Sequence, residues 1–330
     1  MNTIYSLPVT AEDGEVRLDR WFRRRFPHLT QGQVEKMIRT GQVRVDGARA
    51  KASDRLSAGQ MIRIPPLPNA APAAAKGPRI TPEDEAFIKS LVIHRDDDVI
   101  VLNKPHGLAT QGGAKTTRHV DALLDGLKFG NDDKPKLIHR LDRDTSGVLV
   151  LGRNPAAAAF LAEAFRKRTT RKIYWAIVAG VPRPPSGEIR GWMKKAPGAR
   201  DADREMMRRA KHGDPDAQFA ITDYAVISEA AQKASWVAFK PLTGRTHQLR
   251  FHAAEIGHAI AGDPKYKSHR PPPEGLQNKL HLHARALEIP HPKGKMLKVI
   301  AKLPDHMKEA FETLGFDERD AKDPFEAFAE

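Results

Sequence analysis

The sequence contains no cysteine in its 330 residues. This absence excludes disulfide bonds, thiolate nucleophiles and every zinc or iron–sulfur site that needs a cysteine ligand. The phosphate-binding lysine motif of nucleotide hydrolases and the glycine pattern of dinucleotide-binding proteins are also missing. Chemistry driven by nucleotide hydrolysis or by hydride transfer therefore has no support, and we expect no small-molecule cofactor.

Long apolar runs are absent as well. No stretch approaches the length that spans a bilayer, and residues 1–14 lack a basic segment followed by an apolar one, so we expect neither a membrane partner nor a signal peptide. These features predict a soluble, cytoplasmic protein, and nothing in the sequence calls for more than a monomer.

Positive charge is what the chain has in excess. Its net charge is +14 and its pI is about 9.9. Residues 15–65 hold 12 basic and 5 acidic side chains, whereas residues 305–330 hold 3 basic and 9 acidic ones. A clustered positive charge favours a polyanionic partner, because neutralising phosphates releases their counterions. General solubility charge is the plainer explanation.

Composition divides the chain into four parts. Residues 1–64 form a basic module, in which apolar residues at helical spacing alternate with cations. Residues 65–89 form a linker, because prolines remove hydrogen-bond donors and block helices. Residues 90–304 hold the buried-strand patterns of a main domain, and residues 305–330 form a loosely attached acidic tail. The linker prolines are Pro65, Pro66, Pro68, Pro72, Pro78 and Pro82.

The first module shows two helical patterns followed by short strands. Leu18, Trp21, Phe22 and Phe26 recur at helical spacing, as do Val34, Met37 and Ile38 after a capping Thr30. Strands are expected at residues 43–45 and 61–64, separated by an Asp46-Gly47 turn. The cationic faces of the helices include Arg17, Arg20, Lys36 and Arg39.

The main domain centres on the loop from His139 to Gly147. Apolar strand-like residues precede and follow it, so its Asp142 and neighbouring arginines lie between two segments that tend to be buried. Asp144-Thr145-Ser146-Gly147 has the composition of a tight turn. A loop between strands is a rigid mount for reactive groups, although a solvated surface ion pair is the plainer alternative.

Three later segments complete the pattern. Residues 172–180 alternate as a strand with Tyr174 on one face, and residues 155–168 are expected to form a helix with Phe160, Leu161 and Phe165 on one face. Thr243 is expected to cap a helix that contains Arg245, His247 and Arg250, with Arg250 within reach of a carboxylate. Strands are expected at residues 280–287 and 296–301, whereas residues 182–216 stay unassigned, with a hairpin and a basic loop as one interpretation.

Together these motifs resemble a known family. Residues 15–47 are similar to the S4 RNA-binding domain. His139–Gly147, Lys172–Ala176, Thr243–Arg250 and Leu282–Ala284 occur in the order seen in the RluA family of RNA pseudouridine synthases, nearest its RluC group, which acts on ribosomal RNA. The resemblance implies an α+β fold with a central mixed, mainly antiparallel sheet and a catalytic cleft, preceded by a small αα-β domain. Ala259 and Lys267 depart from the family pattern in a peripheral turn.

The resemblance also implies roles for individual residues. Asp142 would attack C1′ of the target uridine or promote loss of its C2′ proton, and the sequence does not choose between the two. Arg250 would pair with Asp142, and Tyr174 would stack on the base with Leu282 beneath it. Arg140 would fill the space left by the flipped nucleotide. Arg143, Arg245 and His247, with the four cations of the first module, would contact RNA, and the resemblance implies the RNA of the large ribosomal subunit.

Several alternatives stay open from the sequence. Tyr174 could be a core tyrosine, and Arg245 and Arg250 could be plain phosphate contacts. His247, His252, His258, His281 and His283 invite a metal interpretation, which we reject for want of a third ligand. Asp96, Asp97 and Asp98 are better explained as a solvated turn. A ribosome-assembly factor without catalysis, a transfer-RNA enzyme and a base-excising glycosylase are the competing functions, although a glycosylase usually needs two opposed carboxylates. The sequence does not name the modified uridine.

Overall fold

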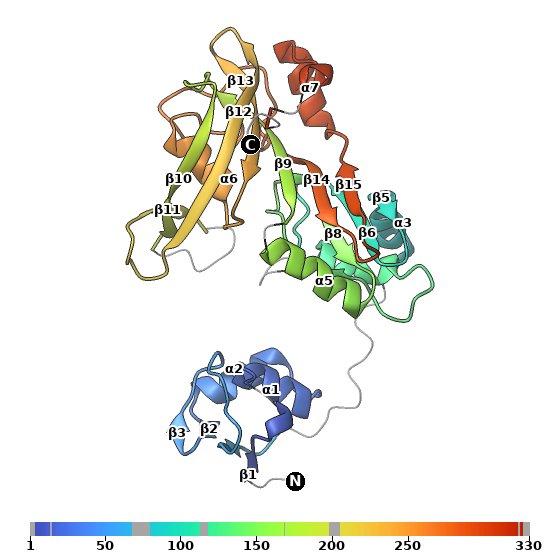
Figure 1. Ribbon diagram of the computed structural model, residues 1–330, viewed down its shortest axis with the longest axis vertical. Helices are drawn as coiled ribbons and strands as arrows, with labels where there is room; N and C mark the ends of the chain where they lie inside the picture. Colours follow the sequence, from blue (N-terminus) through green and yellow to red (C-terminus); the bar gives the residue numbers. More distant parts are fainter. Residues whose placement is uncertain are drawn as a thin grey trace. The chain divides into compact units, whose positions relative to one another are not determined.

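The computed structural model describes residues 4–13, 15–67, 80–112, 118–167, 169–197, 205–322 and 324–325. The chain divides into two units, Met1–Arg79 and Ile80–Glu330, each of which has its own hydrophobic core (Figure 1). No helix within the described residues is long and apolar enough to cross a membrane.

The first unit packs two helices on a small antiparallel sheet with the strand order β1-β4-β2-β3. Trp21 and Phe22 are fully buried, and Thr30 caps the second helix through reciprocal hydrogen bonds with Gln33. The helices therefore follow the predicted apolar spacing. The elements are β1 (Tyr5–Pro8), a 3₁₀ turn (Ala11–Asp13), α1 (Leu18–Arg25), α2 (Gln31–Arg39), β2 (Arg44–Val45), β3 (Ala48–Arg49) and β4 (Met61–Ile64).

The Asp46-Gly47 turn connects β2 to β3, not to the strand at residues 61–64 as expected. Both turn residues have positive φ, 50° and 80°, as a two-residue hairpin requires. Asp46 Oδ1 also accepts a hydrogen bond from the Met61 amide (2.8 Å), which fixes β4 beside the hairpin. Strand β3 was missed because two residues are too few to show an alternating pattern.

The second unit is built on an 11-stranded sheet in the order β11-β10-β12-β13-β9-β14-β8-β6-β5, with β15 paired to β14 and β7 to β8. All of these pairings are antiparallel except that of β8 with β14, which confirms the predicted α+β class. The strands are β5 (Val92–Arg95), β6 (Val99–Lys104), β7 (Lys136–Leu137), β8 (Ser146–Gly152), β9 (Arg171–Ala179), β10 (Ser186–Lys195), β11 (Met207–Ala210), β12 (Gln218–Ala230), β13 (Ala234–Pro241), β14 (Leu282–Pro290) and β15 (Met296–Ile300).

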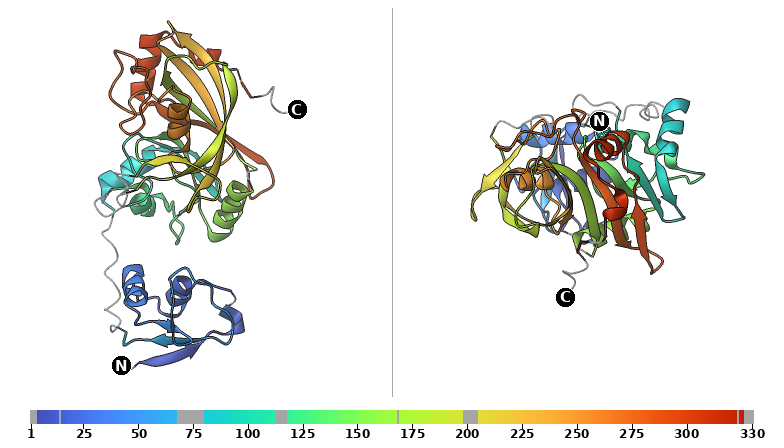
Figure 2. Two further views of the ribbon diagram at one scale, coloured as in Figure 1. Left: turned by 90° about the vertical axis from the view of Figure 1, so that its left-hand side faces the viewer. Right: turned by 90° about the horizontal axis from the view of Figure 1, so that it is seen from above.

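Helices cover this sheet, and in the view from above the strands β10 to β13 curve around α6 (Figure 2). The helices are α3 (Pro82–Ser90), α4 (Val120–Leu123), α5 (Pro155–Arg166), α6 (Gln248–Glu255) and α7 (Asp305–Leu314), with 3₁₀ turns at Leu124–Leu127 and Glu318–Asp320. In α5, Leu161 is fully buried, but Phe160, expected on the same face, is 42% exposed. The unassigned stretch 182–216 supplies β10 and β11, and residues 198–204 of its expected loop lie outside the described residues.

Helix α3 replaces part of the expected linker at residues 65–89. Pro82 occupies its first turn, where no backbone donor is needed, and Thr81 Oγ1 accepts a hydrogen bond from the Asp84 amide (3.1 Å). Ile88 of this helix is fully buried against the sheet. The proline was therefore a helix start and not a linker residue. Linker residues 68–79 lie outside the described residues.

The predicted loose tail at residues 305–330 is wrong for its described part. Met307 and Phe311 of α7 are buried against Trp236, and Phe325 is 1% exposed. The acidic Glu309 and Glu312 lie on the opposite, solvent-facing side of α7. The prediction failed because the high acidic content of this segment was taken as a sign of a loose tail, although its apolar residues have the spacing of a helix with one apolar face. Residues 326–330 lie outside the described residues.

The parallel pairing of β8 with β14 positions the central loop, because β8 begins where the loop ends. Ser146 and Gly147 pair with His283 and Ala284 of β14. Gly147 has φ of 110°, and a Cβ atom there would lie 2.2 Å from the Ala284 carbonyl oxygen. Only glycine permits this approach, so the loop is held directly against β14.

Candidate active site

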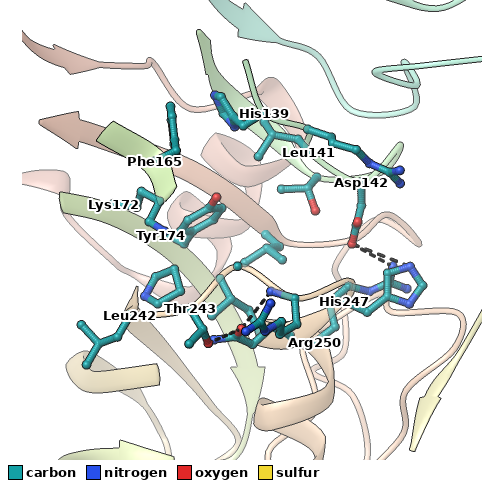
Figure 3. Close-up of a pocket in the computed structure, with 18 of the residues that line it drawn as sticks. His139, Leu141, Asp142, Phe165, Lys172, Tyr174, Leu242, Thr243, His247 and Arg250 are labelled. Atoms are coloured by element: carbon teal, nitrogen blue, oxygen red, sulfur yellow. Dashed lines mark hydrogen bonds and ion pairs between the residues drawn. The ribbon is translucent and has the colours of Figure 1, made fainter. Parts of the chain in front are cut away.

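The central loop forms one wall of a cavity of about 500 Å³. Thr110 fixes this wall, because its hydroxyl donates to the Leu141 carbonyl (2.7 Å) and accepts from the Leu141 amide (3.2 Å). The Thr145 amide donates back to the Asp142 carbonyl (3.2 Å), which closes the turn. The loop thus presents Asp142 to the cavity on a braced backbone (Figure 3). The cavity is also lined by Arg140, Tyr174, Arg245, His247, Arg250 and Leu282.

The structure brings Asp142 and Arg250 together, although they lie far apart in the sequence. Arg250 Nη1 donates to Asp142 Oδ2 at 3.4 Å, a long hydrogen bond (Figure 3). The Asp142 side chain is 24% exposed, whereas that of Arg250 is only 3% exposed. A buried cation therefore faces a carboxylate that stays open to a ligand in the cavity.

Arg250 is held in place by a second carboxylate, Asp263. Its Nε and Nη2 donate to the two Asp263 oxygens at 2.7 and 2.8 Å. Burial opposes the charge of Arg250, but Asp263 and then Asp142 raise its pKa above the ordinary value. The sequence analysis missed Asp263. The sequence pointed to Asp263 only indirectly. A buried arginine needs hydrogen-bond acceptors for its several N–H donors, and pairing Arg250 with Asp142 alone left most of these donors without an acceptor.

His247 lies beside this pair, in an unusual backbone conformation. It precedes α6 with φ of 52° and ψ of 20°, the left-handed region. The expected helix start at Thr243 is therefore wrong, because α6 begins at Gln248. The Gln248 side chain accepts hydrogen bonds from the Thr243 hydroxyl (2.7 Å) and the Arg245 amide (3.0 Å), which fold residues 243–247 into a turn. His247 Nε2 lies 3.8 Å from Asp142 Oδ2.

Tyr174 and Leu282 line the cavity from adjacent strands of the sheet. Tyr174 is on β9 and Leu282 is on β14, where Leu282 pairs with Ala176. Leu282 is 3% exposed and belongs to the apolar cluster that also contacts Tyr174. Burial raises the pKa of the Tyr174 phenol, which therefore stays protonated. An aromatic ring and an aliphatic side chain thus form an apolar part of the cavity wall. Figure 3 shows Tyr174 across the cavity from Asp142.

Lys104 braces the loop from behind, a role that sequence reasoning missed. Its fully buried ammonium donates to the carbonyl oxygens of Pro105 (3.0 Å), Leu108 (2.7 Å) and Arg143 (2.9 Å). Burial lowers its pKa to about 7, although Asp142 and Asp144 oppose the shift. The sequence feature that could have indicated this role is a lysine directly after a run of buried-strand residues.

The comparisons with known proteins agree with this geometry. Residues 98–255 match the family model of RNA pseudouridylate synthase, and residues 16–62 match the S4 domain. A Rickettsia bellii protein named ribosomal large subunit pseudouridine synthase C is 35% identical over 88% of this chain and 95% of the relative. The chain belongs to the RluA family of RNA pseudouridine synthases.

Two further likenesses support the assignment. The Arabidopsis thaliana protein named RNA pseudouridine synthase 4, mitochondrial, is 32% identical over 94% of this chain and 81% of its own. The solved structure of human RNA pseudouridylate synthase domain containing 4 superposes with a TM-score of 0.59 at 28% identity, over 71% of this chain and 98% of the human one. The predicted family and the S4 domain are thus confirmed, and the protein is an isomerase that acts on RNA.

The expected RNA-contacting cations of this synthase fall into two groups. In the second unit, Arg140 and Arg245 line the cavity, whereas Arg143 is exposed and its Nε donates to Asp144 (3.1 Å). In the first unit, Arg17 is bound to Asp19 at 2.7 Å, so part of its charge is neutralised. The remaining three, which are exposed on α1 and α2, are Arg20, Lys36 and Arg39.

The histidines of the pseudouridine synthase domain have separate partners. His252 contacts Thr222 Oγ1 (2.9 Å), His258 contacts the Ala179 carbonyl (2.8 Å) and His283 contacts Ser146 Oγ (2.8 Å). His139, at the start of the central loop, accepts from the Val150 amide (3.0 Å), and burial lowers its pKa to about 3. These contacts explain the histidines as neutral hydrogen-bonding groups of the core.

Another group of ligand-type side chains lies at the Asp96 turn. Single atoms of Asp96, Asp98 and His291 lie within 4.8 Å of one another. Asp96 also contacts His94 (2.7 Å), and the ammonium of Lys293 lies 3.9 Å from Asp98. A neighbouring lysine supplies positive charge at this turn, as in an ordinary surface ion-pair cluster.

Proposed function

We propose that this synthase converts uridine to pseudouridine in large-subunit ribosomal RNA and that Asp142 is its reacting carboxylate. The observation that carries the proposal is the Asp142–Arg250 pair: an open carboxylate faces a buried, fixed cation within one cavity. The relative from Rickettsia bellii bears the name of a ribosomal large subunit enzyme, and the basic S4 unit suits a large structured RNA.

The reaction needs one carboxylate and no redox step. The N1–C1′ bond of uridine breaks, the uracil turns, and C5 forms the new bond to C1′. The hydrogen of C5 leaves as a proton and N1 takes up a proton, so the product is an isomer of uridine. Asp142 would either attack C1′ or promote loss of the C2′ proton. Arg250 would attract the negative charge of Asp142 in both cases, because its guanidinium lies within contact of the carboxylate. Asp144 does not act as an opposed second acid, since it is bound to Arg143 in the adjoining turn.

The cavity is suited to a single extruded nucleotide. A base within a helix is out of reach of a carboxylate, so the target has to flip out of the RNA. Tyr174 and Leu282 offer the apolar part of the cavity wall on which uracil would stack, and the exposed Arg140 would fill the space that the base vacates. Arg245, Arg143 and His247 would then contact the adjoining backbone, with the cations of the S4 unit binding RNA beyond the target.

The test is release of tritium from RNA labelled at C5 of uracil. Forming the new bond must expel this hydrogen, so wild-type protein should release tritium from unmodified ribosomal RNA. Asp142→Asn should abolish release while leaving RNA affinity within a few fold, because the carboxylate serves chemistry more than docking. Asp144→Asn is the matched control: it makes the same change two residues away and should keep the rate within about tenfold.

Each outcome has a distinct meaning. Equal loss of activity in both variants would indicate damage to the loop and would count against Asp142 as the reacting group. A large loss of RNA affinity in Asp142→Asn would contradict the assigned role. Release from transfer RNA but not from ribosomal RNA would keep the chemistry and overturn the proposed substrate.

A further inference from the structure

Tyr266 is a buried side chain whose hydroxyl has partners on both sides. The Met207 amide of β11 donates to it at 2.7 Å, and His247 Nδ1 lies 3.0 Å away. A backbone N–H can only donate, so the phenol oxygen is the acceptor in the first contact. Within the described residues, His247 Nδ1 is the one other partner of the hydroxyl, and the phenol hydrogen can bind it when Nδ1 is the unprotonated nitrogen of the ring.

The protonation states agree with this order. Burial raises the pKa of Tyr266 to about 12, so it is a phenol at neutral pH. Burial also lowers the pKa of His247, and Asp142 only partly offsets this shift, so the imidazole is neutral. The other charged groups that act on His247 are Arg250, Lys265 and Glu205. A neutral ring that accepts at Nδ1 carries its hydrogen at Nε2, the nitrogen 3.8 Å from Asp142 Oδ2.

We propose that Tyr266 is a positioning residue of the synthase: its hydroxyl fixes the tautomer of His247, so that His247 aims an N–H group at the reacting oxygen of Asp142. This inference rests on the proposed role of Asp142. The Met207 amide donates to Tyr266 and the Tyr266 hydroxyl to His247, so the donors run in one direction from strand β11 towards Asp142. For His247 to donate to Asp142, the 3.8 Å separation between them has to shorten when a nucleotide fills the cavity.

The backbone supports this role. His247 has φ of 52°, in the left-handed region that residues other than glycine adopt uncommonly. In this conformation its ring lies 3.0 Å from the Tyr266 hydroxyl on one side and 3.8 Å from Asp142 Oδ2 on the other. Tyr266 also presents its ring to Arg250, whose guanidinium lies 5.3 Å from the ring centroid. One tyrosine therefore contacts both groups that face Asp142.

A neutral donor and a cation have different effects on Asp142. Arg250 already places one positive charge beside the carboxylate, whereas an imidazolium in place of neutral His247 would add a second one and make the carboxylate a weaker nucleophile. The phenol hydrogen at Nδ1 occupies the only position where His247 could take up a proton. Loss of the hydroxyl should therefore raise the pKa of His247 and move the acidic limb of the activity profile to higher pH.

The experiment compares Tyr266→Phe with Tyr224→Phe in the full-length protein. Tyr224 is also buried and its hydroxyl donates to the Pro184 carbonyl (3.0 Å), so the control removes an equivalent hydroxyl that has no contact with His247. Nitrogen NMR of histidine-labelled protein, with His247→Gln to identify the signal, should show His247 as the Nε2–H tautomer in wild type and Tyr224→Phe. The signal should change to a mixed or protonated form in Tyr266→Phe.

The kinetic arm measures tritium release under single turnover across pH. Tyr266→Phe should lose about ten- to a hundredfold in rate near neutral pH with little change in RNA affinity, the range for groups that orient a reacting side chain. In the His247→Gln background, the same substitution should have a much smaller effect, because the hydroxyl acts through His247.

The outcomes separate this inference from the proposed function. An unchanged His247 tautomer in Tyr266→Phe overturns the inference even if the synthase is active. Equal loss of rate in both Tyr→Phe variants overturns it as well, since it would show a general packing effect. If wild type releases no tritium from any RNA, the proposed function fails, while the NMR result still decides the tautomer.

Discussion

Two carboxylates, Asp263 and Asp142, contact Arg250. They differ in exposure, and this difference indicates different roles. Asp263 is 1% exposed and takes up two guanidinium donors at short distance, which is a structural ion pair in a dry site. Asp142 receives one longer contact and keeps an oxygen open to the cavity. The cation is therefore fixed before substrate arrives, and such preorganisation is what electrostatic stabilisation of a reacting group requires.

Asp263→Asn should consequently damage both stability and activity. It leaves the Arg250 charge buried and only weakly paired, and breaking a buried pair costs about 3–5 kcal/mol in free energy of unfolding. Chemical denaturation would measure this loss, and the tritium assay should show a fall in rate at temperatures where the variant is still folded. Asp263 also accepts from the Lys265 and Tyr266 amides, so its loss would loosen the turn that carries Tyr266.

Glu229→Gln is the matched control for this change. Glu229 also binds an arginine through both oxygens, at 2.8 and 3.0 Å from Arg183, but that arginine is 55% exposed. An exposed ion pair contributes little to stability, so Glu229→Gln should unfold close to wild type and keep full activity. A small effect of Asp263→Asn, similar to that of Glu229→Gln, would show that Arg250 does not depend on its second carboxylate.

At the scale of elements, the sequence patterns predicted the presence of strands better than the residues at which elements begin and end. Strands β8, β9, β14 and β15 were predicted because their residues form continuous apolar or alternating runs. The predicted start of helix α6 was several residues too early. His247 adopts a left-handed conformation, which ends the turn and lets the helix begin only at Gln248, although Thr243 is a favourable capping residue. Motifs pointed to Asp142, Arg250 and Tyr174, which line one cavity, whereas Asp263 and Tyr266 contact residues of this cavity through long-range contacts that no local pattern encodes.

Helix α7 offers a test of the corrected C-terminal region. Phe311 is 4% exposed and lies against Trp236, with ring centroids 4.7 Å apart. Phe311→Ala should reduce the free energy of unfolding by about 3–5 kcal/mol, because it removes a buried ring and leaves a cavity. Phe160→Ala, at a 42% exposed position on α5, is the control and should cost under about 1 kcal/mol. Thermal and denaturant unfolding would compare the two, and similar losses would mean that α7 does not belong to the core.

At the scale of the whole molecule, the two units have different charge roles. The catalytic unit needs a local arrangement around one nucleotide, whereas the S4 unit presents cations over an exposed helical surface. The affinity of such a surface depends on salt, because each neutralised phosphate releases counterions. Salt dependence of RNA binding can therefore separate the contribution of the S4 unit from that of the cavity.

The predicted effect concerns a triple variant of the S4 unit, Arg20→Gln with Lys36→Gln and Arg39→Gln. RNA affinity should fall, and the slope of log K against log salt should become shallower by about 0.7–0.9 for each phosphate contact that is lost. The control is Lys293→Gln with Lys298→Gln and Lys308→Gln in the second unit, where each lysine already pairs with a carboxylate. Both variants remove three positive charges, so only a local effect distinguishes them.

Tritium release at saturating RNA completes this experiment. The S4 variant should keep the wild-type maximal rate while needing more RNA to reach it, since its substitutions leave Asp142, Arg250 and Tyr174 untouched. An equal change of slope in the two triple variants would mean that net charge, and not the face of α1 and α2, governs binding. A lower maximal rate in the S4 variant alone would mean that the S4 cations also orient the target nucleotide in the catalytic cavity.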